Sequence, residues 1–536
     1  MKIPPLLIVI LALNFTLLAQ QSIAADCEST RKKPGLSTFY SDGWGIEKTN
    51  TRFQNQAKTS LSAANVSQLK LKWVYGFSTH QPRSFPLVTE DTLFIADGEN
   101  LLALDRETGC VRWQYSGKGD IGTAIVHRII EDQVNLYFSD RMNGVIAVNA
   151  LDGQQLWHET PGDNPIPMYS GTPLVDGESI YVPLSSMEIA LVMNPLYGCC
   201  TTSGGMASLN SETGEFNWYI RSVPELPHKT GSHFLFVEEY GPSGAPVWGT
   251  PTLDKKRSTL YFGTGQNYSR PASDTSDSIF AVNTKDGSTR WIHQFTKGDA
   301  YNMACNLGED HVNCPRPMGP DVDFGAPPIL ATMKNGEGIL IAGQKSGDVH
   351  AMNPATGELI WQTMGIGRGG ALGGIHWGMA VNPDRELLFV PISDVFTGPL
   401  TGEGDGQPGL FALDLNNGAI RWQQVRKPRH DELACAGRNC AAGLSAAITA
   451  TSDLVFTSSL DGFIEALDAS DGAVLWSFDT WRDFSAVNNI LTNGGSFDSH
   501  GPMVADDLLI ISSGYGTFGQ KGGNALLVFQ LQGEGL

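Results

Sequence analysis

The sequence has little that would bind metal or haem through cysteine, few charged residues and few long apolar runs. Its eight cysteines form no CxxC pair, which argues against a thiolate metal site, and no CxxCH, which argues against covalently attached haem. After the first residues, no stretch is long and apolar enough for a membrane helix. Charged residues are only 17%, and the net charge of −20 repels phosphate backbones, so we exclude nucleic acid as a partner.

The residues that are abundant indicate a folded β-rich protein. The 536 residues include 61 glycines and 12 tryptophans, and hydrophobic residues make up 41% of the chain. Such a composition is typical of a packed fold with many tight turns rather than of a disordered chain. We interpret the acidity mainly as a source of solubility, with steering of a basic partner such as a small cytochrome as the alternative.

The N-terminal residues resemble an export signal. Lys2 supplies the positive end, Leu6 to Leu18 the apolar run, and Ser22-Ile23-Ala24 the small residues of a cleavage site. The run is too short to span a bilayer, and Asp26 argues against lipid attachment at Cys27. We therefore expect a signal peptide over residues 1–24, a single domain over residues 25–536, and a periplasmic or secreted protein.

The cysteines that remain after cleavage are even in number, in a compartment where disulfides persist. Short loops favour pairing of Cys305 with Cys314 and of Cys435 with Cys440, which leaves Cys27 to tie the N-terminus to Cys110. Cys199 and Cys200 are adjacent. A bond between neighbours closes no loop, so we interpret this pair as a rigid local surface.

One pattern recurs along the chain: an apolar alternating strand, a short turn that ends in glycine, and a second strand that ends in tryptophan. The seven copies end at Trp113, Trp157, Trp218, Trp291, Trp361, Trp422 and Trp476. The turn glycines are Gly109, Gly153, Gly214, Gly287, Gly357, Gly418 and Gly472. Glycine accepts positive φ without a Cβ clash, so each copy predicts a β-hairpin. We expect the tryptophans to dock each sheet against its neighbour.

The spacing of the copies, on average about 60 residues, leaves room for a four-stranded blade with one or two long loops. An eighth blade is indicated by the ends of the chain, where Asn524 to Leu531 forms the first strand of a copy and Leu69 to Phe77 offers a closing strand. Closure by both termini would remove the free sheet edge. The sequence therefore predicts an all-β, eight-bladed β-propeller.

Long insertions break the repeat after four of the tryptophans. The gaps after Trp157, Trp218, Trp291 and Trp361 reach 61 to 73 residues before the next repeated Trp. Loops held by a rigid scaffold commonly carry function. These loops contain the adjacent cysteines, several carboxylates and tryptophans outside the repeat.

The insertions and the ends of the chain contain strings that resemble one enzyme family. They are NTRFQNQAKTSLSAANVSQLKLKW from Asn50, YVPLSSMEIALVMNPLYGCC from Tyr181, GAPVWGTPTLDKKRSTLYFGTGQNYS from Gly244, GPDVDFGAPPIL from Gly319, AGQKSGDVHAMNP from Ala342, GGIHWGMA from Gly373, GGSFDSHGPM and SGYGTFGQ. Together they resemble the pyrroloquinoline-quinone (PQQ) alcohol dehydrogenases, most closely the polyvinyl-alcohol-dehydrogenase-like branch, over nearly the whole mature chain.

The resemblance implies a propeller that holds the quinone near its axis beside a calcium-type ion. It implies that a vicinal disulfide, matched by Cys199-Cys200, packs on one face of the cofactor and that Trp248 packs on the other. A planar, trianionic cofactor requires flat apolar surfaces with cations and donors at its rim. A hard divalent ion takes oxygen ligands and polarises the carbonyl that accepts hydride.

The family's ligand and catalytic positions also have matches here. Glu188 matches the ligand carboxylate, and Gln266 or Asn267 the amide ligand, with the register between the two amides open. Asp323 matches the catalytic Asp, which is also a metal ligand and takes the hydroxyl proton of the substrate. Asp321 shares its face on a regular strand, so only the likeness of DVDF favours Asp323.

Three further residues lie in matching strings. The resemblance places Lys345 at the quinone oxygens, where its charge would stabilise the reduced form. It places Trp377 at the floor or rim of the pocket. His376, beside it, we interpret as a structural histidine without a chemical role.

The functional prediction is oxidation of an alcohol, with a secondary or polymeric alcohol suggested by the branch, and transfer of the electrons to a separate cytochrome c or another soluble carrier. Two alternatives stay open. One is a non-catalytic propeller that acts as an envelope scaffold or assembly factor, and the other is a PQQ-dependent sugar or aldehyde dehydrogenase.

Overall fold

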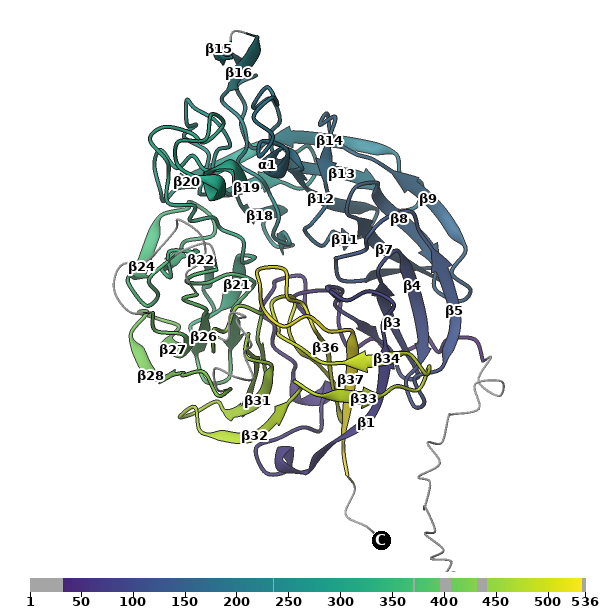
Figure 1. The fold of residues 1–536 in the computed structure, drawn as a ribbon. Coiled ribbons are helices and arrows are strands. Elements are labelled where there is room, and N and C mark those ends of the chain that lie inside the picture. Colours follow the sequence, from purple (N-terminus) through teal and green to yellow (C-terminus); the bar gives the residue numbers. More distant parts are fainter. Residues whose placement is uncertain (1–31, 235, 370–371, 396–405, 431–440, 533–536) are drawn as a thin grey trace, which may run out of the picture.

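The computed structural model describes residues 32–234, 236–369, 372–395, 406–430 and 441–532. In these residues the strands form eight antiparallel sheets with four main strands each, placed one after another around a ring (Figure 1). The predicted all-β, eight-bladed propeller is confirmed. The predicted signal peptide, residues 1–24, lies outside the described residues.

The first four blades follow the chain in order, and each sheet is ordered as its strands are numbered. Blade 1 contains β2 (Leu87–Val88), β3 (Thr92–Asp97), β4 (Asn100–Asp105) and β5 (Val111–Ser116). Blade 2 contains β6 (Val126–Ile130), β7 (Gln133–Asp140), β8 (Gly144–Asn149) and β9 (Gln155–Glu159). Blade 3 contains β11 (Leu174–Asp176), β12 (Ser179–Ser186), β13 (Gly205–Asn210) and β14 (Phe216–Arg221), with β10 (Pro167–Met168) paired to β12. Blade 4 contains β17 (Thr252–Asp254), β18 (Thr259–Gly263), β19 (Ser278–Asn283) and β20 (Thr289–Gln294).

The next three blades repeat this order, and the eighth combines both ends of the chain. Blade 5 contains β21 (Ile329–Thr332), β22 (Gly338–Gly343), β23 (Val349–Met352) and β24 (Leu359–Thr363). Blade 6 contains β25 (Ala380–Asn382), β26 (Leu387–Ile392), β27 (Gly409–Asp414) and β28 (Ile420–Val425). Blade 7 contains β29 (Thr449–Ala450), β30 (Leu454–Ser458), β31 (Phe463–Asp468) and β32 (Val474–Asp479). Blade 8 contains β35 (Met503–Ala505), β36 (Leu508–Ser513), β37 (Ala525–Leu531) and β1 (Leu69–Gly76).

The ring closes in blade 8, as predicted. Strand β1 pairs antiparallel with β37, from Leu69 opposite Leu531 to Gly76 opposite Ala525. The N-terminal strand thus covers the edge that the C-terminal strand would otherwise expose.

The repeated tryptophans dock neighbouring blades, and the structure adds an eighth, Trp73, which the repeat did not reveal. Each indole Nε1 donates a hydrogen bond of 3.0 to 3.3 Å to a backbone carbonyl of the next blade: Trp73 to Arg106, Trp113 to Ala150, Trp157 to Ser211, Trp218 to Thr284, Trp291 to Pro354, Trp361 to Leu415, Trp422 to Ala469 and Trp476 to Leu69. For seven of the eight, all but Trp476, the turn glycine of the next blade lies on the same ring. At Gly153, which has φ 73°, a Cβ atom would lie 2.7 Å from the Trp113 ring.

The hydrophobic cores lie between blades, because each sheet buries both faces. Ile339 in β22 and Leu388 in β26, for example, belong to one buried cluster. The long insertions leave this core and form the short helix α1 (Glu188–Leu191) and the hairpin β15 (His228–His233) with β16 (Val237–Gly241), which projects at the top of Figure 1. A second hairpin joins β33 (Asp483–Ser485) to β34 (Leu491–Asn493).

The predicted disulfides Cys199–Cys200 and Cys305–Cys314 are present. The predicted pairs Cys27–Cys110 and Cys435–Cys440 involve residues outside the described part of the chain. Among the described residues, no helix is long and apolar enough to cross a membrane.

Candidate active site

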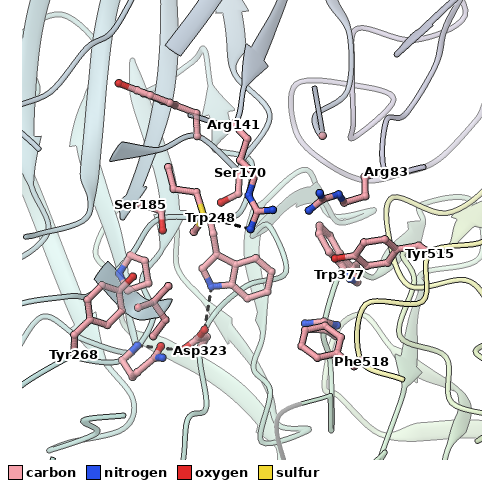
Figure 2. Close-up of a pocket in the computed structure, with 17 residues that line it drawn as sticks. Arg83, Arg141, Ser170, Ser185, Trp248, Tyr268, Asp323, Trp377, Tyr515 and Phe518 are labelled. Atoms are coloured by element: carbon pink, nitrogen blue, oxygen red, sulfur yellow. Dashed lines mark hydrogen bonds between the residues drawn. The ribbon is translucent and has the colours of Figure 1, made fainter. Parts of the chain in front are cut away.

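A cavity of ≈ 220 Å³ is lined by segments that precede or belong to blades 1 to 6 and blade 8 (Figure 2). Because only the axis of the ring is near all of these blades, the cavity lies at the axis. Six of its seventeen lining residues are aromatic: Tyr169, Trp248, Tyr268, Trp377, Tyr515 and Phe518. The polar side chains that line it include Arg83, Arg141, Gln266, Asp323 and His376.

Asp323 lies in the loop that leads into β21, and three groups hold its carboxylate. The backbone N–H of Gln266 donates to Oδ1 at 3.0 Å, and Trp248 Nε1 donates to Oδ2 at 3.0 Å. Lys345 Nζ lies 3.6 Å from Oδ2. The side chain is 7% exposed. Asp323 is therefore a fixed hydrogen-bond acceptor in the cavity wall.

Asp321 and Asp323 have different surroundings. Lys345 Nζ lies 3.2 Å from Asp321 Oδ2, and Asp321 is absent from the cavity lining. Burial acts to lower the pKa of Lys345, but the carboxylates of Asp321 and Asp323 outweigh it and raise that pKa above its usual value. Lys345 therefore stays charged behind Asp323, while Asp323 is the carboxylate that lines the cavity.

Trp248 forms a flat, partly exposed surface beside Asp323. Its ring lies on the backbone of Gly325, where a Cβ atom would be 1.9 Å from ring carbons. Trp377 contacts it edge to face, with ring centroids 5.8 Å apart, and His376 does the same at 5.7 Å. Figure 2 shows Trp248 between Asp323 and Trp377. The structure thus places Trp248, Trp377 and Asp323, three residues that the resemblance singles out, in the wall of one cavity.

The two candidate amides differ in what they bind. Asn267 is fully buried, its Nδ2 donates to Ser243 O at 2.7 Å, and its Oδ1 accepts from Ser273 N at 2.8 Å. Gln266 lines the cavity, and its buried Oε1 has no hydrogen-bond partner among the described residues. The structure therefore leaves the side-chain oxygen of Gln266, a residue of the cavity wall, without a hydrogen-bond partner and engages Asn267 in the loop.

Glu188 and the vicinal disulfide do not line the cavity, contrary to what the resemblance implied. Glu188 is completely buried at the start of α1, and its carboxylate accepts from Thr201 N at 2.9 Å, Thr202 N at 2.8 Å and Tyr197 Oη at 3.0 Å. These bonds occupy the carboxylate with the loop that follows the disulfide. Among the described residues, no three His, Cys, Asp or Glu side chains converge as a metal site.

The disulfide Cys199–Cys200 belongs to a small buried cluster that includes Tyr268. Tyr268 lines the cavity, whereas Cys199 lines a separate surface hollow beside β16. In this structure, Tyr268 is therefore the side chain at the cavity, and the disulfide lies behind it. The predicted stacking of the disulfide on a cofactor does not fit this placement.

Two arginines line the cavity that were not predicted from the sequence. Arg83 forms an ion pair with Asp120, and its guanidinium lies 5.6 Å from the Tyr515 ring centroid. Arg141 forms no ion pair within the described residues; its guanidinium donates to Met168 Sδ at 3.6 Å. Burial, and then the charge of Arg83, lower the pKa of Arg141. Because Asp120 is the one ion-pair partner of these two neighbouring cations among the described residues, their excess positive charge favours an anionic ligand.

Both arginines also line a second, wider hollow of ≈ 790 Å³, which we call the vestibule. Its other lining residues include Ser78 to Gln81, Asp97 to Asn100, Asp120, Met142 and Met187. The exposed side chains of Ser78 and His80 place it at the surface. The cavity and the vestibule therefore meet at the two arginines.

Two family models match the chain. One, described as outer membrane protein assembly factor BamB, matches residues 55–233 and 407–526, and the other, described as glucose/ethanol/alcohol dehydrogenase, beta-propeller domain, matches residues 193–366. The first covers blade repeats at both ends of the chain. The second covers Trp248, Gln266, Asp323 and Lys345, the residues that form the site.

Individual relatives of the chain indicate the same class of enzyme. The chain is 34% identical to a polyvinylalcohol dehydrogenase of a Pseudomonas species, over 92% of this chain and 77% of the relative, and 32% identical to that of Sphingopyxis sp. (strain 113P3), over 92% and 76%. The crystal structure of the quinohemoprotein alcohol dehydrogenase from Comamonas testosteroni shares the fold, with a TM-score of 0.68 at 17% identity over 94% of this chain and 82% of that one. By this identity over nearly its whole length, the chain belongs to the PQQ-dependent alcohol dehydrogenase family.

Proposed function

We propose that this protein oxidises an alcohol to a carbonyl compound with PQQ as the bound cofactor. The observation that carries the proposal is the carboxylate of Asp323, held in the axial cavity by Trp248 Nε1 and the N–H of Gln266, each at 3.0 Å. A fixed carboxylate at a cavity wall accepts the proton of a substrate hydroxyl. PQQ, when bound, supplies the acceptor for the hydride that leaves the same carbon.

The cavity suits a flat anionic cofactor. The exposed face of Trp248 offers a planar apolar surface, with Trp377 at its edge. Arg83 and Arg141 provide positive charge at the mouth, and Lys345 provides it behind Asp323. These are the surfaces and charges that carboxylates on a planar ring system require.

The oxygen donors in the cavity suit a hard cation. Gln266 Oε1 is buried without a partner, and the backbone N–H of the same residue bonds the Asp323 carboxylate. We propose these two as protein ligands, in preference to Asn267 and Glu188, whose oxygens accept hydrogen bonds from the protein itself. Ca²⁺ takes six to eight oxygen ligands, so the cofactor and water would supply the remainder.

The substrate and the electron acceptor follow from the relatives and the charge. Polyvinylalcohol dehydrogenases as relatives support a secondary or polymeric alcohol, and the vestibule offers such a chain access to the cavity. The sequence lacks CxxCH, so we propose a separate acceptor of the cytochrome c type, which the net charge of −20 would attract if it is basic. The two described disulfides and the N-terminal pattern support a periplasmic or secreted location.

Two other functions would make different demands on the cavity. An assembly factor would need the blades, which the BamB family model matches, but not the polar residues of the cavity. An enzyme for sugars or aldehydes with the same cofactor would keep this cavity and differ in the substrates that it oxidises. Cofactor uptake separates the first alternative, and a substrate screen separates the second.

The test is reconstitution of the purified protein with PQQ and Ca²⁺, followed by absorption spectroscopy and dye-linked oxidation of a series of alcohols, sugars and aldehydes. We expect stoichiometric cofactor uptake and turnover with secondary alcohols. Asp323→Asn should retain the cofactor and lose about 10² to 10⁴ in kcat. Asp471→Asn is the matched control, because Asn417 already makes the same turn bond in blade 6 that Asp471 makes in blade 7. Absence of cofactor uptake by the oxidised, folded protein would favour the scaffold.

A further inference from the structure

His376 lines the cavity and is held from behind by a buried carboxylate. Its Nδ1 lies 2.7 Å from Ser445 Oγ and 3.2 Å from Asp498 Oδ1. Asp498 is completely buried, and the same oxygen accepts hydrogen bonds from Ser445 Oγ and, at 2.8 Å, from Trp377 Nε1. The three groups come from segments more than 50 residues apart, since Ser445 and Asp498 differ by 53 positions. The arrangement is a histidine and an aspartate that meet only in the fold.

The hydrogen bonds decide which ring nitrogen faces the cavity with a lone pair. A carboxylate only accepts hydrogen bonds, and the hydroxyl of Ser445 donates its single proton to Asp498. Nδ1 must therefore carry the proton that it donates to Ser445 Oγ and Asp498 Oδ1. In the neutral imidazole, Nε2 is then the nitrogen without a proton, and it makes no hydrogen bond to any described residue. Because His376 lines the cavity, Nε2 is the basic atom that the histidine presents to it.

A neighbouring histidine shows that this arrangement is not a general feature of the region. His500 also contacts Trp377, with ring centroids 5.3 Å apart, and its Nε2 bonds to the carbonyl of Gly122 at 2.8 Å. Its Nδ1 is buried without a partner, and burial lowers its pKa to about 4. His500 has no carboxylate behind it and stays neutral. Only His376 of this pair combines a free Nε2 at the cavity with an acid behind it.

We propose that His376 is a second proton acceptor in the cavity, distinct from Asp323, and that Asp498 positions it. The inference rests on the proposed oxidation. One alcohol that becomes a carbonyl compound releases two electrons and two protons. Asp323 takes the proton of the hydroxyl, and the hydride carries both electrons and the second proton. When the two electrons pass in turn to two molecules of an external one-electron acceptor, His376 Nε2 takes up that remaining proton, and Asp498 stabilises the resulting imidazolium. Asp323 and His376 then release their protons to solvent.

The first experiment separates the two half-reactions in the holoprotein by rapid mixing. In His376→Asn, the amide takes the place of Nδ1 toward Ser445 and Asp498, and Nε2 is lost. We expect reduction by alcohol to stay within about twofold of wild type and reoxidation by the acceptor to fall by about 100-fold. Imidazole added to His376→Ala should restore part of the reoxidation rate. His500→Gln, in which the amide replaces Nε2 toward Gly122, is the control and should change neither half-reaction.

The second experiment needs no cofactor. In the apoprotein labelled with ¹⁵N-histidine, the NMR signals of His376, assigned by their loss in His376→Asn, should be those of the Nδ1–H tautomer. Asp498→Asn should shift the tautomer toward Nε2–H and also slow reoxidation. An Nε2–H tautomer in the wild type, unchanged reoxidation in His376→Asn, or an equal fall of both half-reactions would each overturn the proposal. If wild-type holoprotein failed to oxidise any alcohol, the proposed function would be the part that fails.

Discussion

Gly325→Ala tests whether the position of Trp248 is what makes the cavity a site. The new Cβ atom would lie 1.9 Å from two ring carbons of Trp248. Carbon atoms in contact are about 3.5 to 4.0 Å apart, so ring and backbone must separate by about 1.6 Å. The Trp248 Nε1–Asp323 hydrogen bond is 3.0 Å long and cannot follow such a shift within the 3.5 Å limit of a hydrogen bond.

The consequences can be expressed as magnitudes. Overpacking of this kind costs about 1 to 3 kcal/mol of stability, which a propeller of this size tolerates. Misplacement of a catalytic group by about 1 Å costs on the order of 10²-fold in rate. We therefore expect Gly325→Ala to fold, to bind PQQ more weakly and to lose about 100-fold or more in kcat/KM.

The assay is cofactor titration by tryptophan fluorescence, together with dye-linked turnover and thermal unfolding. Gly338→Ala is the matched control on the neighbouring strand β22, since its Cβ would meet its nearest atom at 3.5 Å, an ordinary contact. Cofactor affinity and turnover at wild-type levels in Gly325→Ala would refute the idea that Trp248 forms the surface on which the cofactor lies.

Three further outcomes are expected. Gln266→Leu should weaken Ca²⁺-dependent PQQ binding at least tenfold with little change in Tm. Asn267→Leu should instead lower Tm, because it removes two hydrogen bonds of a buried side chain, each worth about 1 kcal/mol. Equal effects of the two would contradict the assignment of the amide ligand. Trp113→Phe removes the 3.0 Å bond to Ala150 O and should destabilise the protein by about 1 kcal/mol in a denaturant titration, without effect on the kcat of the holoprotein. Burial lowers the pKa of His350 to about 4, so as the pH falls the unfolded chain binds a proton at this histidine before the folded chain does. The free energy of unfolding therefore falls by about 3 kcal/mol as the pH drops from about 6.5 to 4. The Tm of His350→Phe should fall less than that of wild type between pH 7 and pH 4.5, and parallel curves would exclude this cause.

Features of the fold that depend only on residues close together in the chain could be predicted from the sequence. Gly153 and Trp157 belong to one hairpin, and the same spacing in seven copies indicates blades without knowledge of what they contact. Trp73 docks a blade in the same way but was missed, because its partner strand, β37, lies more than 450 residues away and no hairpin turn precedes it. A repeat search finds units that are continuous in the chain, and the closing blade is not.

The site could be predicted only in part, and through resemblance. Asp323 and Trp248 lie in strings typical of the family, and the structure places both at the cavity. Neither Arg83 nor Arg141 lies in a distinctive pattern, so no local signal separates them from solvated arginines. His376 was interpreted as structural because Asp498, the residue that orients it, is 122 positions away.

The sequence alone determined that this chain builds a ring of blades and belongs to a redox enzyme family, because hairpin turns, alternating strands and family strings are properties of neighbouring residues. Only the tertiary structure decided that the side-chain oxygen of Gln266 rather than that of Asn267 has no hydrogen-bond partner, and that Tyr268 rather than Cys199–Cys200 lines the cavity. The physical reason is that a side chain's role at the axis depends on which donors and rings arrive from other blades. Those partners come from loops whose separation along the chain carries no information about their distance in space.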